Sequence, residues 1–477
     1  MFAGLDLGTS SLKAILVDDA DRVLAEHSVP LAVERPRDGW SEQDPATWIA
    51  SAREALAALA AAQDCRRLAG IGLAGHMHGA TMVGADGQAL RPCLLWNDTR
   101  AHAEAAALDA DPRFRATTGN IVFPGFAAPK VEWVRRHEPE VFDAVRHVLL
   151  PKDYLRLWLT GEAVSEMSDA AGTAWLDTGA RDWSDDLLAA CHLSRERMPT
   201  LVEGSAPSGL LRAELAAELG LPRVTVAGGA GDNAAAAIGT GVVADGAAFL
   251  SLGTSGVLCA AASGYRPDAA TAVHTFCHAV PGAWLQMGVI LAATDALEWL
   301  SRLTGRSAAQ LTGDLGPLQA PAGPLFLPYL GGERTPHNDA QVRGAFAGLG
   351  HADGPEELAR AVIEGVAFAF ADCASALEAT GTKIERLIGV GGGTRSDYWV
   401  AALATALDMP VELPVSGDFG GAFGAARLAM MADGAGTDIA TVPPIARAVE
   451  PDPDLRDAFA AGHARHRDLA DRMKGLA

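Results

Sequence analysis

The chain opens with three apolar stretches separated by short polar turns. Residues 2–7, 12–18 and 23–29 are rich in Leu, Ile, Val and Ala, and the segments between them are Gly8–Ser11 and Asp18–Asp21. Apolar runs of this length between turn-forming residues are typical of β-strands. The pattern therefore predicts three consecutive strands at the start of the chain.

An alternation of helices and strands follows. Residues 46–62 form an Ala-rich run that predicts a helix, with Asp44 as its N-cap and Pro45 at the first helical position. Leu68–Leu73 then predicts a strand that runs into the glycine-flanked loop 74–79. A loop in this position delivers side chains to a cleft.

The order strand, glycine-rich loop, helix occurs twice further along. The first copy combines a strand at 223–227, the loop Gly228–Asn233 and a helix from Ala234. The second combines a strand at 386–390 with the loop Gly391–Ser396 and another helix. Strands are also expected around 247–261, and further helices at 294–304, at 356–380 and, as an amphipathic helix on the outside, at 454–473.

One short pattern also occurs twice, about half the chain apart. Leu5–Lys13 and Leu250–Val257 each predict a strand, a Gly-Thr-Ser turn and a second strand. Glycine lets backbone N–H groups approach an anion, and Thr and Ser add hydroxyl donors. Asp6 in the first copy corresponds to Ser251 in the second, and one carboxylate suits a single Mg²⁺ held mainly by water and phosphate. A lone turn of this kind is more often a plain hairpin, but the pair favours two halves gripping one nucleotide.

Length and composition agree with two domains. The chain has 477 residues, of which 49% are hydrophobic and 20% charged, which is too long for one ordinary core and too apolar for a disordered chain. We expect domains at 1–243 and 244–477, joined by a short hinge near 241–246.

Charge and cysteine content restrict the partners. The net charge of −21 disfavours nucleic acid and anionic membrane, which both require clustered Lys and Arg. No signal peptide or spanning segment is expected, and the scattered cysteines are typical of a reducing, cytoplasmic compartment. These are Cys65, Cys93, Cys191, Cys259, Cys277 and Cys373. A homodimer is conceivable, although no stretch marks an interface.

Two loops carry the candidate chemistry for a substrate. Asp232 could accept a proton from a hydroxyl or merely cap a helix; capping is the commoner role, but the surrounding glycines would let a substrate reach the carboxylate. Asn233 could bind an adjacent hydroxyl. Met77 and His78 would offer a polyol an apolar wall and a neutral hydrogen-bonding group, and the absence of acidic or Cys neighbours argues against a metal there.

Other features bear on the nucleotide. Gly391–Gly393 would suit a ribose or flat ring against the backbone. This run is not a G-x-G-x-x-G dinucleotide pattern, because Ser396 stands where the last glycine would be, and the sequence has no P-loop. Lys13 could neutralise phosphate or point to solvent.

The chain resembles the FGGY carbohydrate kinases over nearly its whole length. The resemblance lies in Asp6–Ser10, Trp40–Pro45, Met77–Ala80, Leu94–Asp98, Pro124–Phe126, Ala128–Lys130, Leu150–Leu155, Ser168–Thr173, Gly231–Asn233, Ser251–Gly256, Phe326–Tyr329, Gly332–Asn338 and Gly391–Ser396. It implies an α/β, two-domain actin-like ATPase fold with ribonuclease-H-like cores around a central cleft. It also implies Mg²⁺- and ATP-dependent phosphorylation of D-xylulose to D-xylulose 5-phosphate, in D-xylose catabolism feeding the pentose phosphate pathway.

The resemblance also implies a role for individual residues. Asp232 matches the general base; Met77, His78 and Asn233 match sugar contacts; and Asp6 matches the metal-associated carboxylate. The nucleotide-binding candidates are Thr9, Ser10, Lys13, Gly253, Thr254, Trp299, Gly392 and Gly393. His76 departs from the family, which usually has Gln there, as does Ala230 in the glycine tract.

Two other functions remain open at this point. A kinase for ribulose or glycerol would share the nucleotide site and differ around residues 76–78 and 232–233. An actin-like ATPase acting as a switch would keep both Gly-Thr-Ser turns but need no sugar loop. ATP turnover measured against a panel of sugars separates the three.

Overall fold

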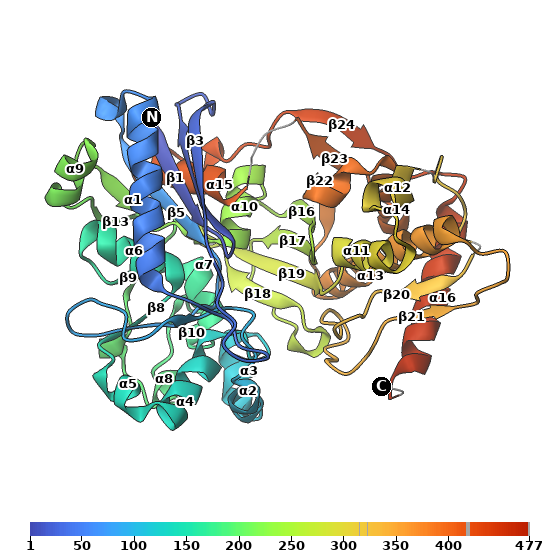
Figure 1. Ribbon diagram of the computed structural model, residues 1–477, viewed down its shortest axis with the longest axis horizontal. Coiled ribbons are helices and arrows are strands. Elements are labelled where there is room, and N and C mark those ends of the chain that lie inside the picture. Colours follow the sequence, from blue (N-terminus) through green and yellow to red (C-terminus); the bar gives the residue numbers. More distant parts are fainter. Residues whose placement is uncertain (314, 322, 416–419, 476–477) are drawn as a thin grey trace.

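Two mixed β-sheets form the framework of the protein, one in each half of the chain (Figure 1). The computed structural model describes residues 1–313, 315–321, 323–415 and 420–475. The strands of the first sheet are β1 (Phe2–Leu7), β2 (Ser11–Val17), β3 (Val23–Pro30), β5 (Gly70–Gly75), β13 (Pro207–Leu210), β14 (Thr225–Ala227) and β15 (Ala230–Gly231). Those of the second are β16 (Gly246–Leu252), β17 (Gly256–Ala262), β18 (His274–Cys277), β19 (Trp284–Ile290), β22 (Ile384–Val390), β23 (Val411–Pro414) and β24 (Ile445–Val449).

The two sheets share one topology. The first contains the strand order β3-β2-β1-β5-β14 and the second the order β19-β17-β16-β22-β23. In each, the first two pairings are antiparallel and the next two are parallel. The Gly-Thr-Ser turns join equivalent strands, β1 to β2 and β16 to β17. The predicted duplication of the hairpin is therefore confirmed, and it extends to whole sheets.

Helices cover both sheets. In the first half they are α1 (Pro45–Ala62), α2 (His102–Asp109), α3 (Pro112–Thr118), α4 (Ala127–His137), α5 (Pro139–Ala144), α6 (Pro151–Thr160), α7 (Met167–Ala170), α8 (Asp185–Ala190), α9 (Ala213–Leu219) and α10 (Asp232–Thr240). In the second they are α11 (Thr294–Thr304), α12 (Ala308–Gly313), α13 (Pro355–Ala379), α14 (Asp397–Leu407), α15 (Gly421–Ala432) and α16 (Arg456–Met473). Small two-stranded sheets in the connections use β4 (Glu42–Gln43) with β7 (Cys93–Leu94), β6 (Thr81–Val83) with β8 (His147–Leu149), β9 (Val164–Glu166) with β12 (Thr200–Val202), β10 (Leu176–Asp177) with β11 (Asp182–Trp183), and β20 (Leu325–Leu327) with β21 (Ala345–Ala347).

Most predicted elements are present, with small shifts at their ends. The Asp44 carboxylate caps α1 by accepting a hydrogen bond from the Ala46 N–H, as predicted. The strand expected at 68–73 is β5, two residues later, and the helix expected from Ala234 already begins at Asp232. The predicted outer helix, α16, packs against α13 and α14 through one face.

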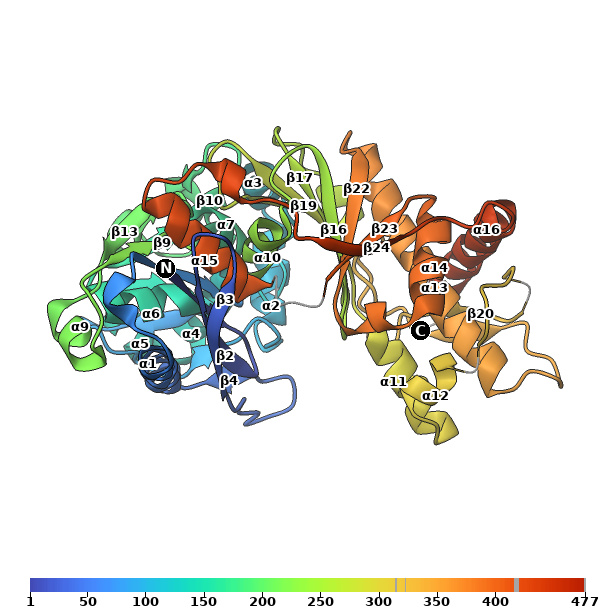
Figure 2. The ribbon, with the colours of Figure 1, turned by 90° about the horizontal axis from the view of Figure 1, so that it is seen from above.

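Helix α15 crosses from the second half of the chain to the first sheet, where it packs against β1, β5 and α10 (Figure 2). Glycines make this approach possible. A Cβ at Gly72 would lie 1.8 Å from the Ala425 carbonyl oxygen, and one at Gly4 would lie 1.9 Å from that of Ala422. Strand glycines of this kind mark places where another backbone passes closely. The predicted C-terminal domain, 244–477, therefore includes a helix that belongs to the packing of the first sheet.

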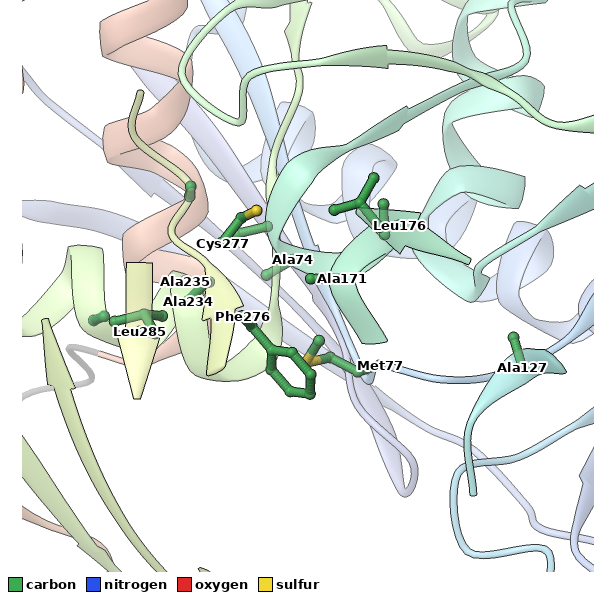
Figure 3. Close-up of a cluster of buried hydrophobic side chains, with 14 of the residues drawn as sticks. Ala74, Met77, Ala127, Ala171, Leu176, Ala234, Ala235, Phe276, Cys277 and Leu285 are labelled. Carbon is green, nitrogen blue, oxygen red and sulfur yellow. The ribbon is translucent and has the colours of Figure 1, made fainter. Parts of the chain in front are cut away.

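The largest hydrophobic core also joins both halves (Figure 3). Met77, in the loop after β5, lies in it with Phe276 of β18, and α10 contributes Ala234 and Ala235. The predicted hinge is only the segment between α10, which ends at Thr240, and β16. The two halves are thus held by shared core packing as well as by the chain.

The six cysteines are free and buried, as the sequence predicts. Among the described residues, no helix is long and apolar enough to cross a membrane.

Candidate active site

Two cavities meet at the start of helix α10. The larger, of about 760 Å³, is lined by residues of both halves, and the smaller occupies about 270 Å³. Asp232 and Asn233 line both cavities. Pockets for small molecules usually lie between about 300 and 1,000 Å³, so one cavity has room for a nucleotide and the other for a small polar molecule.

The backbone delivers Asp232 to this junction. Strand β14 ends at Ala227, the glycine-rich loop follows, and Asp232 is the first residue of α10. The N-cap is Gly231, so the capping role that competed for Asp232 in the sequence is wrong. The carboxylate accepts hydrogen bonds from the backbone N–H of Asn233 at 2.7 Å and from its side-chain amide at 3.0 Å. Both bonds reach the same oxygen, Oδ1.

Burial raises the pKa of Asp232 to about 6, although the two hydrogen bonds from Asn233 oppose the shift. A carboxylate with this pKa is ionised at neutral pH but holds a proton more tightly than an ordinary Asp does. Such a group can accept a proton from a hydroxyl, because a general base works best when its pKa lies near the working pH. The chemistry of the junction therefore fits a base.

His78 forms one wall of the smaller cavity in a fixed orientation. Its backbone adopts a φ of +70°, and its ring stacks on Phe126 with centroids 4.6 Å apart. Nδ1 lies 2.7 Å from the Gly172 carbonyl oxygen. Burial lowers the pKa of His78 to about 3, so the ring is neutral. Because the carbonyl can only accept, Nδ1 carries the proton and Nε2 is left as an acceptor.

A buried lysine supports this wall from behind. The Lys130 ammonium donates hydrogen bonds to the backbone oxygens of His78, at 3.0 Å, and Gly125, at 2.6 Å. Its side chain is fully buried, and burial lowers the pKa of the ammonium to about 7. Gly125 also lines the smaller cavity, so Lys130 joins two of the segments that shape it.

Part of the wall of the smaller cavity comes from the second half of the chain. Arg334 lies with its guanidinium carbon 4.5 Å from the centre of the Phe123 ring and one nitrogen 3.4 Å from Nε2 of His274. Both Arg334 and His274 line the cavity. Neither residue was predicted from the sequence to have a role. Arg334 lies in Gly332–Asn338, one of the stretches that carry the family resemblance, and this could have indicated a role for it. No such signal exists for His274, whose strand is brought to the smaller cavity only by the fold.

Both Gly-Thr-Ser turns adjoin the smaller cavity, and a residue just before the second turn lines the larger one. The hydroxyl of Thr9 accepts a hydrogen bond of 3.0 Å from the indole N–H of Trp96, which lines the smaller cavity. Ser255, in the second turn, lines that cavity too, and Ser251 lines the larger one. The remaining predicted positions of the turns are Ser10, Gly253 and Thr254, whose contacts with phosphate stay a prediction.

Asp6 lies at the end of β1, close to the start of α15. A Cβ at Gly421 would lie 2.5 Å from one oxygen of the Asp6 carboxylate. Lys13 is its partner in the β1–β2 register, and the Lys13 ammonium lies 3.1 Å from the Glu26 carboxylate. No group of three or more His, Cys, Asp or Glu side chains that could hold a metal occurs among the described residues. A cation near Asp6 would thus depend on other oxygen donors.

The predicted adenosine positions differ in their surroundings. Gly391, Thr394 and Arg395 line the larger cavity, so the loop that contains Gly392 and Gly393 borders it. Trp299 instead stacks with Phe326, at 5.8 Å between ring centroids, and with Phe346. It is not among the residues that line the larger cavity, and its contact with adenine stays a prediction.

The family departure at His76 does not reach the cavities. His76 is buried and packs edge-on against Trp48 with 5.8 Å between ring centroids. Burial lowers its pKa to about 3. His76 itself lines neither cavity, so an effect of this departure on the sugar would act through its neighbours Met77 and His78. Ala230 is likewise fully buried, in the bridge to β5.

Paired sheets of one topology, with twin turns and an acid at a shared cleft, define a two-domain actin-like ATPase. Comparisons give the family. The profile described as FGGY family of carbohydrate kinases, N-terminal domain, matches residues 1–239, and the C-terminal domain of that family matches residues 248–432. The chain belongs to the FGGY family of carbohydrate kinases. As a sugar kinase, it takes a sugar and ATP as substrates.

Its relatives agree over almost the entire chain. It is 50% identical over 435 residues to the xylulose kinase of Klebsiella pneumoniae, covering 91% of this chain and 90% of that one. A crystal structure of a xyloylose kinase from Brucella ovis superposes with a TM-score of 0.99 and 56% identity over 100% of both chains. The xylulose kinase structure from Rhodospirillum rubrum gives a TM-score of 0.93 at 32% identity, covering 100% of this chain and 99% of that one.

Proposed function

We propose that this chain catalyses the ATP-dependent phosphorylation of D-xylulose to D-xylulose 5-phosphate. The observation that carries the proposal is the position of Asp232 and Asn233, which line both cavities at once. A base at this junction can touch the sugar in the smaller cavity while facing the nucleotide in the larger one. The names of two curated relatives, both xylulose kinases at 48% and 50% identity, support D-xylulose as the sugar.

In the proposed reaction, the terminal hydroxyl oxygen of the sugar attacks the γ-phosphorus of ATP. The new O–P bond forms as the bond from the γ-phosphorus to its bridging oxygen breaks, and the hydroxyl proton passes to Asp232. Phosphoryl transfer has a loose, in-line transition state, so the protein mainly positions the groups and stabilises their charge. General base catalysis by Asp232 would contribute about 10²- to 10⁴-fold.

The smaller cavity suits a ketose. Nε2 of His78 would accept a hydrogen bond from one hydroxyl, the Asn233 amide would bind another, and Met77 would cover the apolar face of the carbon chain. The backbone and hydroxyls of Thr9, Ser10, Gly253 and Thr254 would hold the phosphates of ATP. Closing the two halves would exclude water and limit hydrolysis of ATP.

Mg²⁺ fits this site through Asp6. Its single carboxylate lies beside the N-terminus of α15, near the first turn, and a hard cation of this kind takes its other ligands from water and phosphate oxygens. When bound with ATP, the ion would neutralise charge on the β- and γ-phosphates. The buried, free cysteines are consistent with a reducing, cytoplasmic location for the reaction.

The proposal is tested by ADP release measured with D-xylulose, D-ribulose and glycerol, for the wild type and for Asp232→Ala. We expect D-xylulose to give the highest kcat/KM, and Asp232→Ala to lower kcat at least 100-fold while the protein still binds the sugar. A higher kcat/KM with D-ribulose than with D-xylulose would make D-ribulose the preferred substrate. If no sugar stimulated ATP turnover, an ATPase switch would replace the kinase, and a variant with near wild-type kcat would remove Asp232 as the base.

A further inference from the structure

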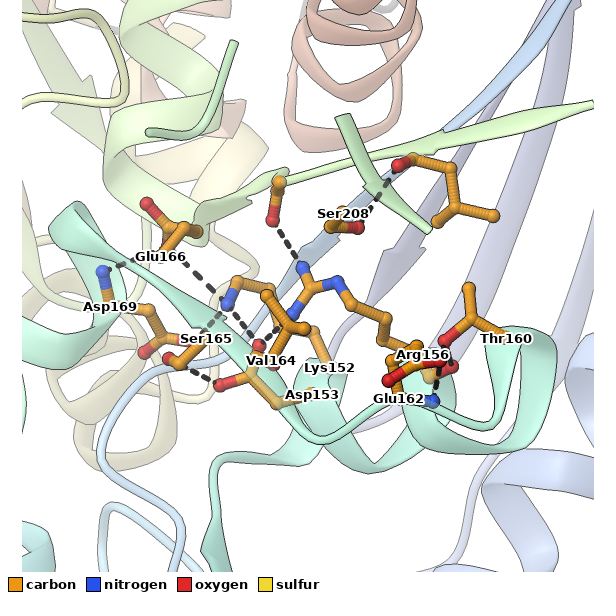
Figure 4. A network of polar contacts seen from close by, with 12 residues as sticks. Lys152, Asp153, Arg156, Thr160, Glu162, Val164, Ser165, Glu166, Asp169 and Ser208 are labelled. Atoms are coloured by element: carbon orange, nitrogen blue, oxygen red, sulfur yellow. Dashed lines mark hydrogen bonds and ion pairs between the residues drawn. The ribbon is translucent and has the colours of Figure 1, made fainter. Parts of the chain in front are cut away.

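A buried cluster of ionisable side chains (Figure 4) adjoins the segment Gly228–Gly231, which leads to Asp232. It is built from α6, β9 and α7 and lines neither of the two cavities of the site. Its members are fully buried and consist of Lys152, Asp153, Arg156, Glu166 and Asp169.

The cluster is internally paired. The Lys152 ammonium lies 2.6 Å from Asp153, 3.0 Å from Asp169 and 3.3 Å from Glu166. Arg156 donates to the same Asp153 oxygen, Oδ1, at 2.5 Å. Burying ions costs several kcal/mol each before pairing, and a hydrophobic cluster of similar volume is often as stable or more so. Stability alone is thus a weak reason for this arrangement, and its contacts with the neighbouring loop offer a better one.

Two members of this region hold the catalytic loop by its backbone. The hydroxyl of Ser168 accepts a hydrogen bond from the Gly231 N–H at 3.1 Å and donates its own proton to Glu166 at 2.8 Å. The Arg156 guanidinium donates to the Gly228 carbonyl oxygen. The two contacts fall at the two ends of the loop, and the residue that follows Gly231 is Asp232 itself.

The loop needs such support because it has few side chains of its own. Gly229 adopts a φ of +76°, a conformation that is easily accessible to glycine. Because glycine has the most conformational freedom of any residue, fixing it there costs the most entropy. Gly231 lies so close to Met77 that a Cβ would be 2.7 Å from its Cγ. A displacement of Gly231 would therefore move the base and disturb the wall of the sugar cavity together.

We propose that Ser168 is a positioning residue for Asp232. Its hydroxyl connects the buried cluster, through Glu166, to the backbone N–H of Gly231, the residue that precedes the base. The inference rests on the proposed role of Asp232 and adds to it the device that keeps the carboxylate in place. Displacing a catalytic group by about 1 Å can cost about 100-fold in rate, so one hydrogen bond here can matter more than its own strength.

Ser168→Ala tests this role against Ser165→Ala as a matched control. Ser165 is equally buried, but its hydroxyl donates to Asp153 of the cluster, at 2.6 Å, and not to the segment Gly228–Gly231. We expect Ser168→Ala to lower kcat about 10- to 100-fold with KM for ATP within about threefold, and Ser165→Ala to keep kcat within about twofold. Equal kcat values for the two variants at equal melting temperatures would overturn the proposal.

A double variant separates positioning from general damage. If Ser168 acts through the base, adding Ser168→Ala to Asp232→Ala should lower kcat by less than about twofold further, because the group being positioned is gone. A full multiplicative loss would assign Ser168 a merely structural role. Should Ser168→Ala fail to fold, Ser168→Cys, of similar size but with a weakly bonding thiol, takes its place in both comparisons.

The test also distinguishes the two proposals. A collapse of kcat in Asp232→Ala with an unchanged kcat in Ser168→Ala would refute only the positioning role. Near wild-type kcat in Asp232→Ala would refute the base, and the positioning role with it.

Discussion

The indole N–H of Trp96 donates a hydrogen bond to the hydroxyl of Thr9 at 3.0 Å. Trp96 lines the smaller cavity, and Thr9 belongs to the first Gly-Thr-Ser turn. The wall of the proposed sugar site and the proposed phosphate turn are thus one hydrogen-bonded unit. Contact of a sugar with Trp96 can be transmitted to the turn without a large movement of the chain.

We expect Trp96→Phe to lower kcat/KM for ATP more than it weakens the binding of sugar by the enzyme. The variant keeps an aromatic wall but leaves Thr9 without this donor, and a neutral hydrogen bond contributes about 0.5–1.5 kcal/mol, or about 2- to 10-fold. Steady-state kinetics should show kcat/KM for ATP reduced by this factor. Trp158→Phe, in α6 away from both cavities, is the control, and an equal effect of the two changes would contradict the link.

The Trp96–Thr9 contact also marks a limit of the sequence. Local patterns predicted the first hairpin, the turn and the strand that ends before Met77, because alternation of apolar runs and turn residues is encoded by neighbours in the chain. They could not predict that Trp96, from the connection between β7 and α2, would bind Thr9. Partners so distant in sequence are set by the packing of whole elements.

The same limit explains α15. Its sequence predicts nothing about which sheet it covers, and the glycines that admit it, Gly4 and Gly72, read locally as ordinary strand residues. Arg334 and His274 were missed as cavity residues for a related reason, since β18 and the loop after β20 reach the sugar side only in the folded protein. The site residues that the sequence did predict follow predicted strands: Met77 and His78 lie in the loop after β5, and Asp232 and Asn233 begin α10.

The raised pKa of Asp232 predicts that the pH profile of kcat has an acidic limb, that is, a range of low pH over which kcat falls. The base is active when ionised, so kcat should fall as the pH drops through about 6. Asn233→Ala removes the side-chain donor that lowers this pKa, and the limb should move to higher pH. Profiles of kcat at saturating sugar measure both effects. A limb that stays in place in Asn233→Ala would contradict the assignment of the limb to Asp232.

The same pKa has a consequence for stability. The native carboxyl binds its proton more tightly than the unfolded one, whose pKa is about 3.9, so stability declines as the pH rises from about 4 to about 6 and remains reduced above. Asp232→Asn removes the buried charge. We expect its melting temperature to exceed that of the wild type at pH 8 and this difference to shrink at pH 4. A constant difference would contradict the burial of an ionised Asp232.

Gly172 should control the affinity for sugar. A Cβ at this position would lie 2.6 Å from both Nδ1 and Cε1 of His78. In Gly172→Ala the His78 ring must therefore tilt, and its Nε2 atom no longer points in the same direction. We expect KM for the sugar to rise at least tenfold while KM for ATP changes less than twofold. Gly350→Ala, on the surface with only an ordinary contact to Asp353, is the control. A larger change in KM for ATP than for sugar would argue against His78 as a sugar contact.

Gly72→Ala should destabilise the first sheet. Its Cβ would lie 1.8 Å from a backbone oxygen of α15, which cannot rotate away as a side chain could, so strand and helix must separate. Overpacking of this kind costs about 1–3 kcal/mol, and more where backbone must move. Denaturant unfolding should show a lower midpoint than in Gly350→Ala. An unchanged midpoint would mean that α15 does not pack on β5.

Gly421→Ala meets a different neighbour and should therefore have a different effect. Its Cβ would lie 2.5 Å from an oxygen of Asp6, the end of a side chain, which can turn aside without unfolding the protein. If Asp6 orients Mg²⁺, the displaced carboxylate should raise the Mg²⁺ concentration for half-maximal rate about tenfold, the size of effect seen when groups around a metal are disturbed. KM for the sugar and the unfolding midpoint should stay near the wild type, in contrast to Gly72→Ala. The rate of each variant, titrated with Mg²⁺ at saturating sugar, compares the two. If Gly421→Ala lost stability but needed the same Mg²⁺ concentration, the contact between Gly421 and Asp6 would matter only for packing. The proposed role of Asp6 in binding Mg²⁺ would then be refuted.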